Sequence, residues 1–352
     1  MKTDHILIIR FSAMGDVAMT VPVVYSLAMQ YPHLRITVLS KPFARAFYED
    51  LAPNVGFMGV SADEMGNVRG LNELYRRLTA KKFTAIADFH DVLRSKYLRL
   101  RFNMGQFRVE HIDKHRKGKR LLVSQQAKQL VQQPTSFQNY ADVLARLGYP
   151  VTMSFGSLFG PRGGDLSQLS TAIGTKEAGS QWIGIAPFAA HRGKVYPIAH
   201  MRRVIELLTQ GHAARRLFLF GGGSEERAML DDIASANPQC VNASAMLSGL
   251  GQELILMSHL DAMLSMDSAN MHLASLVATP VVSVWGATHP YAGFMGWHQP
   301  ADSAVQVDLP CRPCSIYGNR PCLRGDYACM NNIRPEDIVR KIEAVCHDHN
   351  HA

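Results

Sequence analysis

Long apolar runs are absent from this sequence. No stretch of its 352 residues approaches the roughly 20 consecutive apolar residues that a membrane-spanning helix requires. Near the N-terminus, Asp4 and His5 precede only a short apolar run, which is too little for the hydrophobic region of a signal peptide. We therefore expect a cytoplasmic protein without a membrane span.

The sequence also lacks the composition of a disordered chain, because 47% of its residues are hydrophobic and only 19% are charged. A chain of 352 residues is too long for one typical hydrophobic core, so we expect two domains.

Motifs typical of two other protein classes are missing. No G-x-G-x-x-G follows the first strand expected in either half, which disfavours an NAD-dependent oxidoreductase. No aromatic RNA-binding motif or helix-turn-helix pattern is present either. Nucleic acid is therefore not an expected partner.

Positive charge exceeds negative charge, giving a net charge of +8 that favours acidic partners. The excess is concentrated in residues 94–120, which hold ten Lys or Arg against only Glu110 and Asp113. Such a segment can bind an anionic membrane or a phosphorylated substrate, or it can be a solvated surface without a ligand.

Short apolar runs rich in β-branched residues alternate with helical patterns, which predicts parallel strands joined by crossover helices. In the first half, strands are expected at 5–11, 35–40, 55–60 and 83–90, and helices at 17–31, 42–50, 67–81 and 135–147. In the second half, strands are expected at 182–188, 216–222, 240–244, 262–267 and 281–286, and helices at 200–210, 225–236, 249–258, 268–277 and from Pro335.

A Gly- and Ser-rich stretch, residues 157–181, is the expected linker between these halves. We predict two α/β domains of similar size with a cleft between them, at 1–165 and 166–352, with a last helix that can pack back on the first domain. Ligands of open α/β sheets bind at the carboxyl ends of strands, so the strand-to-helix turns are the candidate sites.

The first such turn reads Ser12-Ala13-Met14-Gly15-Asp16. Asp16 can be the N-cap of the following helix, with Gly15 permitting a tight turn. It can also be a carboxylate that accepts a proton from a substrate hydroxyl. A helix N-terminus favours the charged carboxylate, which makes it a weaker base, but capping and catalysis can coexist.

Two turns of the second half carry groups suited to an anion. In the first, Asp267 closes a strand and Ser268-Ala269-Asn270 begin a helix whose free N–H groups can bind a phosphate, with His272 one turn in. In the second, Lys194 lies in a cationic loop. The alternatives are a simple cap, a core histidine and solvated surface charge.

A third turn, LFGGGSEERAML at 219–230, has three glycines before a helix. Glycines let a ligand approach the backbone, and Glu225 or Glu226 can accept hydrogen bonds from a ribose diol.

Four cysteines lie close together near the C-terminus. Cys311, Cys314, Cys322 and Cys329 give the spacing C-x2-C-x7-C-x6-C. This pattern is compatible with structural zinc, with reduced thiols or with disulfides, and the spacing is not that of a standard zinc ribbon.

Several of these motifs together resemble the ADP-heptose:lipopolysaccharide heptosyltransferases, glycosyltransferase family 9. The family's N-terminal S-x-M-G-D is similar to residues 12–16, and its D-[ST]-G-x-x-H is similar to residues 267–272. Lys194 before Tyr196-Pro197 and the acidic pair before Arg227 also match, and the matches cover nearly the whole chain. Ala269 departs from the family's usual Gly, and Tyr196 occupies a site that often carries Trp.

The resemblance implies a GT-B fold, an α/β architecture of two Rossmann-like domains that bind the acceptor and the nucleotide-sugar. It implies inverting transfer that needs no metal or other cofactor for catalysis. Asp16 would be the base, with Ser12, Met14 and Gly15 on the acceptor side. The residues implied for the donor are Lys194, Glu225, Asp267, Ser268, Ala269 and His272.

The implied donor is ADP-heptose or a related nucleotide-sugar, and the implied acceptor is an anionic glycolipid of the lipopolysaccharide core or lipid A type. The protein would then work peripherally at the inner face of the cytoplasmic membrane, with the basic segment near the lipid. A nucleotide- or phosphate-binding protein without transferase activity is the alternative from another functional class.

Overall fold

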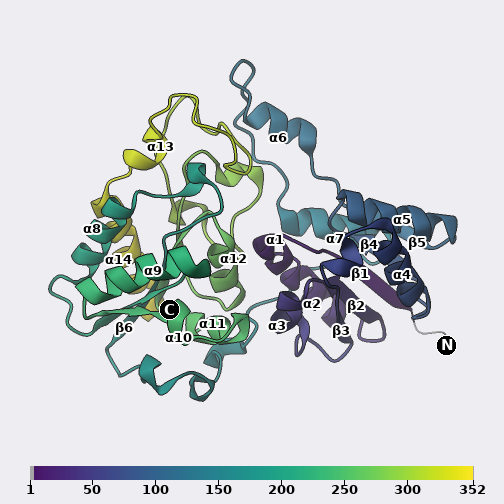
Figure 1. Cartoon of the computed structure of the whole chain (residues 1–352), viewed down its shortest axis with the longest axis horizontal. Helices are drawn as coiled ribbons and strands as arrows, with labels where there is room; N and C mark the ends of the chain where they lie inside the picture. Colours follow the sequence, from purple (N-terminus) through teal and green to yellow (C-terminus); the bar gives the residue numbers. More distant parts are fainter. Residues whose placement is uncertain (1–3, 352) are drawn as a thin grey trace. The chain divides into compact units, whose positions relative to one another are not determined.

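The computed structural model describes residues 4–351, with side chains described for residues 4–347 (Figure 1). The chain forms two compact units, each with its own parallel sheet. The first comprises Met1–Lys114 and Pro134–Leu158, and the second comprises His115–Gln133 and Phe159–Ala352. Nothing in the sequence pattern indicated that residues 115–133 belong to the second unit.

The first unit is built on a five-stranded sheet of order β3-β2-β1-β4-β5 (Figure 1). All its strands are parallel, namely β1 (His5–Ile9), β2 (Arg35–Ser40), β3 (Val55–Gly59), β4 (Ala85–Asp88) and β5 (Arg108–His111). The four predicted strands are confirmed. The edge strand β5 was missed because it is short, half-exposed and charged, and so lacks an apolar pattern.

Helices α1 (Met14–Ala18), α2 (Val21–Gln30), α3 (Arg45–Tyr48), α4 (Val68–Thr79), α5 (Leu93–Met104) and α7 (Ser136–Arg146) complete this unit. The helix predicted at 17–31 is confirmed over Val21–Gln30, but it does not begin at 17, because a separate helix α1 precedes it and ends before Met19 and Thr20. Pro22 has no N–H for the carbonyl of Ala18, so one continuous helix is disfavoured at this point. The charged helix α5 was not predicted.

The second unit has a six-stranded parallel sheet of order β11-β10-β9-β6-β7-β8. The five predicted strands are confirmed as β6 (Gln181–Ala186), β7 (Arg215–Leu219), β8 (Cys240–Asn242), β9 (Ala262–Met266) and β10 (Val281–Val284). The short edge strand β11 (Ala304–Val305) was not predicted. The predicted linker contains three short 3-10 turns, Gly160–Arg162, Leu166–Gln168 and Thr171–Ile173.

The helices of this unit are α6 (Arg116–Leu122), α8 (Ile198–Thr209), α9 (Gly223–Ala236), α10 (Ala243–Met246), α11 (Leu250–Met257), α12 (Ala269–Leu276), α13 (Ala328–Asn331) and α14 (Pro335–His351). The last of them packs on α8 and on the second sheet, where Ile338, Ile342 and Cys346 join the buried core.

Each sheet has one point at which the strand order reverses. In the first sheet β1 lies between β2 and β4, and in the second β6 lies between β7 and β9. A crevice forms beyond the carboxyl ends of the strands at such a point, because the two connections leave in opposite directions. The turns after β1, β4, β6 and β9 are therefore the places where each unit can bind a ligand.

Candidate functional site

Asp16 occupies the third position of α1, directly after β1. Ala13 is the N-cap residue, so the interpretation of Asp16 as the N-cap is wrong. The Asp16 carboxylate instead turns back and accepts a hydrogen bond of 3.2 Å from the N–H of Ala13. Its side chain remains 32% exposed, which leaves the carboxylate reachable by a substrate.

Arg10, the residue after β1, holds the same carboxylate. Its Nη2 lies 2.7 Å from Asp16 Oδ2, while its Nη1 donates a 2.7 Å hydrogen bond to the carbonyl of Phe89 after β4. The Arg10 side chain is only 7% exposed, so the guanidinium is fixed between the two turns. A buried cation at this distance favours the ionised form of Asp16.

His90 lies in the turn after β4, next to the turn after β1, and the sequence analysis missed it. Its Nδ1 accepts the N–H of Phe11 at 3.4 Å. Burial and, secondly, the charge of Arg10 lower the pKa of His90 to about 3, although Asp16 acts in the opposite direction. His90 is therefore neutral near pH 7, and because Nδ1 accepts, its hydrogen is assigned to Nε2.

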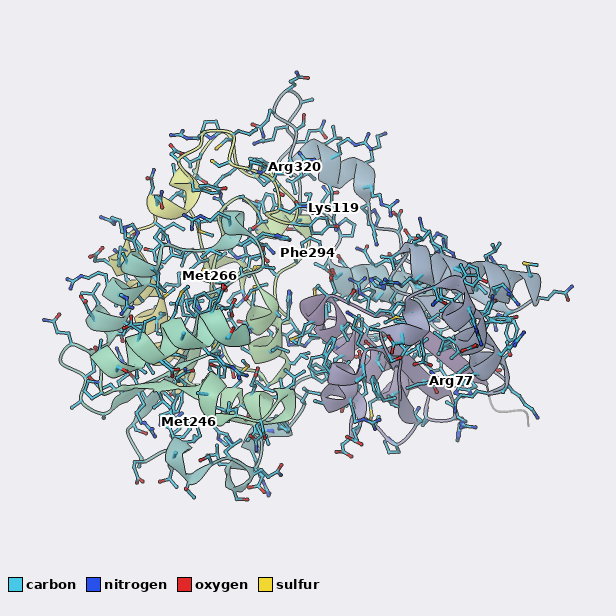
Figure 2. All side chains as sticks on the ribbon, in the orientation of Figure 1. Arg77, Lys119, Met246, Met266, Phe294 and Arg320 are labelled. Atoms are coloured by element: carbon cyan, nitrogen blue, oxygen red, sulfur yellow. The ribbon has the colours of Figure 1, made fainter. Side chains whose placement is uncertain are left out.

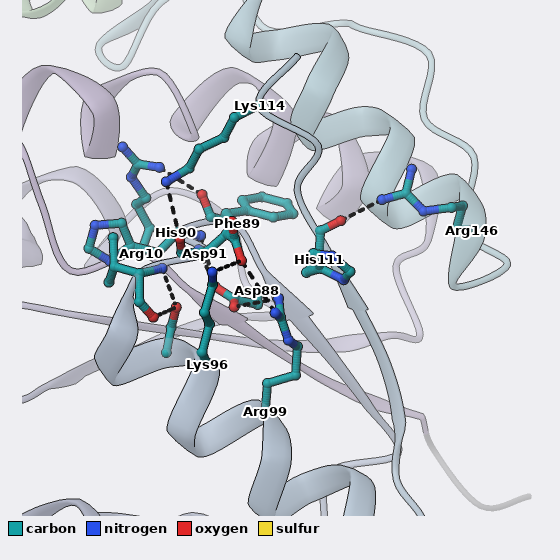
Figure 3. Close-up of polar contacts among 12 residues, drawn as sticks. Arg10, Asp88, Phe89, His90, Asp91, Lys96, Arg99, His111, Lys114 and Arg146 are labelled. Atoms are coloured by element: carbon teal, nitrogen blue, oxygen red, sulfur yellow. Dashed lines mark hydrogen bonds and ion pairs between the residues drawn. The ribbon is translucent and has the colours of Figure 1, made fainter. Parts of the chain in front are cut away.

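A buried ion-pair cluster fixes the turn after β4 (Figure 3). Asp88 Oδ1 accepts the backbone N–H groups of His90 and Asp91, and Asp88 Oδ2 lies 3.2 Å from Arg99. Arg99 and Lys96 of α5 also pair with Asp91, at 3.3 and 3.6 Å. Part of the basic segment thus neutralises buried acids.

The remaining residues of the first turn surround Asp16. Gly15 is buried, and Ser12 and Met14 are half-buried. Tyr140 of α7 donates from its hydroxyl to the backbone carbonyl of Asp16 at 3.2 Å, which fixes α1 from its other side. The acceptor-side role of Ser12, Met14 and Gly15 stays a prediction.

In the second unit, Lys194 and Asp267 form an ion pair. Lys194 follows β6 and Asp267 follows β9, and their Nζ and Oδ2 atoms lie 3.1 Å apart. The Asp267 side chain is 5% exposed and that of Lys194 is 17% exposed. An ammonium has three N–H donors, so Asp267 can orient it while other donors remain for a phosphate.

Ser268 is the N-cap residue of α12, in an extended conformation, and Ala269 is the first helical residue. Ser268 Oγ lies 3.2 Å from Ser265 Oγ, and its side chain makes no capping hydrogen bond. Ala269 is not among the described residues with positive φ, so this position does not require the Gly that is usual in the family. His272 is buried in the same helix.

Two glycines position Lys194. A Cβ added to Gly318, whose φ is +74°, would approach Lys194 Cγ to 2.6 Å, and one added to Gly193 would approach the carbonyl of Gly318 to 2.9 Å. The carbonyl of Gly193 in turn accepts the N–H of Ala287 at 2.8 Å. The loop carrying Lys194 is therefore packed against the turn after β10.

The two acidic candidates in α9 differ in their surroundings. Glu226 Oε2 accepts the N–H of Gly222 at 2.7 Å and so caps the start of its own helix. Glu225 is exposed in the first turn. Since Glu226 already serves the backbone, the structure favours Glu225 as the group for a ribose, and that role stays a prediction.

The four clustered cysteines line one small cavity. All six cysteines of the chain are free. Within residues 4–347, no group of three or more His, Cys, Asp or Glu side chains is arranged to hold a metal ion. Burial raises the pKa of Cys314, and it raises that of Cys329 to about 11, so both thiols are protonated at neutral pH in this arrangement.

Residues 115–133 are attached to the cysteine region. Lys128 Nζ donates to the carbonyls of Pro310 and Arg312 at 2.8 and 2.9 Å. The Lys119 ammonium lies 4.3 Å from the ring centre of Phe294 (Figure 2). The basic segment 94–120 is thus divided between the two units and is not one continuous patch.

The model of glycosyltransferase family 9 (heptosyltransferase) matches residues 71–321, which is more than half of the chain. The chain belongs to glycosyltransferase family 9. It is therefore a glycosyltransferase, as the motifs at 12–16 and 267–272 indicated, and not an NAD-dependent oxidoreductase.

Individual relatives are distant. Lipooligosaccharide heptosyltransferase 2 of Haemophilus influenzae is 31% identical over 115 residues, spanning 31% of this chain and 32% of that relative. The solved structure of E. coli ADP-heptose lps heptosyltransferase II is similar with a TM-score of 0.70 and 18% identity, covering 98% of this chain and 99% of that chain.

E. coli heptosyltransferase WaaC, solved with ADP, is similar with a TM-score of 0.66 and 16% identity, covering 97% and 99% of the two chains. These likenesses establish the GT-B fold, and they confirm the predicted fold class. Among the described residues, no helix is both long enough and apolar enough to cross a membrane.

Proposed function

We propose that this protein is an inverting glycosyltransferase that moves a heptose or related sugar from an ADP-sugar to a lipopolysaccharide core or lipid A-type acceptor. The observation that carries the proposal is the Asp16 carboxylate, held by Arg10 at the reversal point of the first sheet and partly exposed there. Names of relatives support the donor and the acceptor, since one is an ADP-heptose lps heptosyltransferase and another was solved with ADP.

In the proposed reaction, Asp16 accepts the proton of an acceptor hydroxyl as its oxygen attacks the anomeric carbon of the sugar. The bond from this carbon to the diphosphate breaks, and a single displacement inverts the configuration. Arg10 keeps Asp16 ionised before the transfer. The neutral His90 beside it adds no second positive charge to the crevice.

The departing ADP gains negative charge, which Lys194 and the N–H groups at the start of α12 stabilise. Asp267 orients the Lys194 ammonium through their 3.1 Å contact. A protein ammonium and a helix N-terminus supply positive charge without a divalent cation, which supports metal-independent transfer.

The test combines binding and turnover. ADP should raise the melting temperature more than UDP or GDP, because a ligand of only the folded state stabilises it by mass action. Incubation with ADP-heptose and a heptose-free lipopolysaccharide should release ADP and add one heptose to the lipid. Stabilisation by ADP without transfer to any extracted acceptor would favour the non-catalytic nucleotide-binding protein instead.

A further inference from the structure

Helix α5 of the first unit is apolar on two opposite faces. Leu98 and Phe102 are fully buried in the core beneath the first sheet. On the outside, Leu93, Leu100 and Met104 are 85%, 58% and 73% exposed. Three large exposed apolar side chains on one helix of twelve residues are more than scattered surface hydrophobics explain.

The exposed apolar residues form one stripe along the helix. At 3.6 residues per turn, positions 93, 97, 100 and 104 fall within about 60° of one another on the helix surface, opposite the buried positions. Tyr97 is the half-buried member of this stripe, and its hydroxyl donates to Asn72 Oδ1 of α4 at 2.8 Å. The stripe therefore runs along α5 beside α4 (Figure 1).

Basic residues flank this stripe on both sides. Helical geometry places Arg94 and Arg101 along one flank and Lys96 and Arg99 along the other. Arg94 and Lys96 are exposed, although Lys96 also pairs with Asp91 at 3.6 Å, and Arg99 is fixed by Asp88 and Asp91. No acidic residue lies between positions 93 and 104.

The neighbouring helix α4 also exposes apolar and basic side chains. Its exposed residues include Val68, Arg69, Arg76 and Arg77. Arg69 pairs with Glu73 and Arg77 pairs with Glu64, so part of this charge is neutralised locally. Positive charge still exceeds negative charge along the two helices.

We propose that the outer face of α5 is the surface by which the protein lies on an anionic lipid bilayer. An apolar stripe between basic flanks is the arrangement of an interfacial helix, in which the apolar side chains enter the boundary of the acyl chains while the cations meet lipid phosphates. Each exposed Lys or Arg near such a surface is attracted by the anionic head groups, and salt screens this attraction.

Charge complementarity selects the bilayer over other occupants. A symmetric contact between two copies would bring the same basic flanks together, and their repulsion opposes it. A polyanion such as nucleic acid would satisfy the cations but leave the apolar stripe against phosphates. The inference rests on the proposed function in one respect, which is that the acceptor is a lipid.

Vesicle sedimentation tests the proposal. The full-length protein is mixed with vesicles of equal parts phosphatidylglycerol and phosphatidylcholine, or of phosphatidylcholine alone. The triple variant Leu93→Ser, Leu100→Ser, Met104→Gln removes the stripe, and Arg94→Gln with Arg76→Gln removes exposed charge from α5 and α4. Met29→Gln is the matched control, because Met29 of α2 is 54% exposed in the same unit.

The protein and the Met29→Gln variant should bind the anionic vesicles and not the neutral ones. The triple variant should need about tenfold or more lipid for half-binding, since apolar insertion contributes much of interfacial affinity. The charge variant should bind the anionic vesicles weakly, and its binding should depend less on salt concentration than that of the unchanged protein. All variants should keep their melting temperatures, because the changed side chains are exposed.

Binding of the triple variant equal to that of the unchanged protein would overturn the proposal, and so would absence of binding by the unchanged protein. If the unchanged protein elutes as a dimer in gel filtration and only the triple variant elutes as a monomer, the stripe is instead a contact between two copies of the chain. Sugar transfer to a deacylated, water-soluble acceptor is measured in parallel. If the variants lose vesicle binding and keep this transfer, the surface and the proposed activity are separately established.

Discussion

Arg10 illustrates how one residue can set the chemistry of its neighbour. Its guanidinium is buried, lies 2.7 Å from Asp16 and is fixed at its other side by the carbonyl of Phe89. The ion pair favours the ionised carboxylate, which must be unprotonated to accept a proton. The charge of Asp16 also acts on His90 and Tyr140, whose pKa values it raises.

Replacing Arg10 by Gln should lower turnover and move the acid limb of the pH profile of kcat/KM to higher pH, because the carboxylate then protonates more readily. Arg10→Lys should keep the limb near its original position, since it retains the charge. Arg69→Gln, at a side chain that is 90% exposed, is the control. An unmoved limb in Arg10→Gln would refute the electrostatic role of Arg10.

His90 makes the first unit sensitive to acid. Its folded-state pKa of about 3 lies below the ordinary value of 6.5, so unfolding is accompanied by proton uptake. The stability that neutral His90 contributes is present above pH 6.5 and is lost as the pH falls towards 3.

The variant His90→Asn, whose amide oxygen can accept the N–H of Phe11, should escape this loss. Relative to pH 7, the unchanged protein should lose about 2 to 3 kcal/mol more than the variant at about pH 4.5. Urea unfolding at the two pH values measures the difference. Equal losses in both proteins would contradict the assignment of His90 as a buried neutral group.

At the scale of elements, the sequence predicted every strand that is buried on both faces. The strands β1 and β9 are continuous apolar runs between turn residues, so they have a clear pattern. The sequence pattern did not predict β5 and β11, which are edge strands of four and two residues. Their hydrogen bonds to a neighbouring strand define them, and a local pattern does not contain that information.

Helix α5 was missed for a related reason. It has apolar residues on two faces and many charges, so its hydrophobic periodicity is weak. The sequence therefore indicated a basic segment at 94–120 and no helix. The N-cap alternative for Asp16 is wrong because the first helix begins three residues earlier than predicted, at Met14, with Ala13 at the cap position. Arg10 and His90 carry no motif of their own and become recognisable only when β1 and β4 pair.

The loop that carries Lys194 provides a prediction at this scale. Gly318→Ala should weaken the thermal stabilisation by ADP, because a Cβ there would displace the Lys194 side chain, 2.6 Å away, besides straining a φ of +74°. Gly211→Ala shares the strain, with a φ of +77°, but meets no atom within 4 Å.

Both substitutions should lower the melting temperature of the free protein, because the backbone strain lowers the free energy of unfolding by about 1 kcal/mol in each. Adding ADP should raise the melting temperature of the control variant Gly211→Ala as much as that of the unchanged protein, and it should raise that of Gly318→Ala less. A full ADP shift in Gly318→Ala would contradict the proposal that Gly318 holds Lys194 in position for the nucleotide.

For the whole molecule, the sequence predicted two α/β domains but not the assignment of residues 115–133 to the second unit. That assignment depends on contacts distant in sequence, such as those of Lys128 with the carbonyls of Pro310 and Arg312. No local pattern indicates such contacts. The predicted boundaries at 165 and 166 stay an approximate division of the chain.

The cysteine cluster offers a test on the intact protein. The structural-zinc hypothesis predicts one zinc per chain, and its removal should lower the melting temperature. Metal analysis with thiol titration decides this, and a zinc-free protein with all of its thiols titratable would reject it. Turnover should be unchanged by EDTA in either case, because the proposed transfer uses Asp16 and Lys194 without a metal.

The most direct measurement compares the unchanged protein with Asp16→Asn in transfer from ADP-heptose and in binding of ADP. The amide preserves size but cannot accept the acceptor proton, and general-base catalysis typically contributes 10²- to 10⁴-fold. The account predicts a loss of turnover of at least about 100-fold, with the thermal shift by ADP retained. Full activity of Asp16→Asn would contradict the central claim that Asp16 is the base.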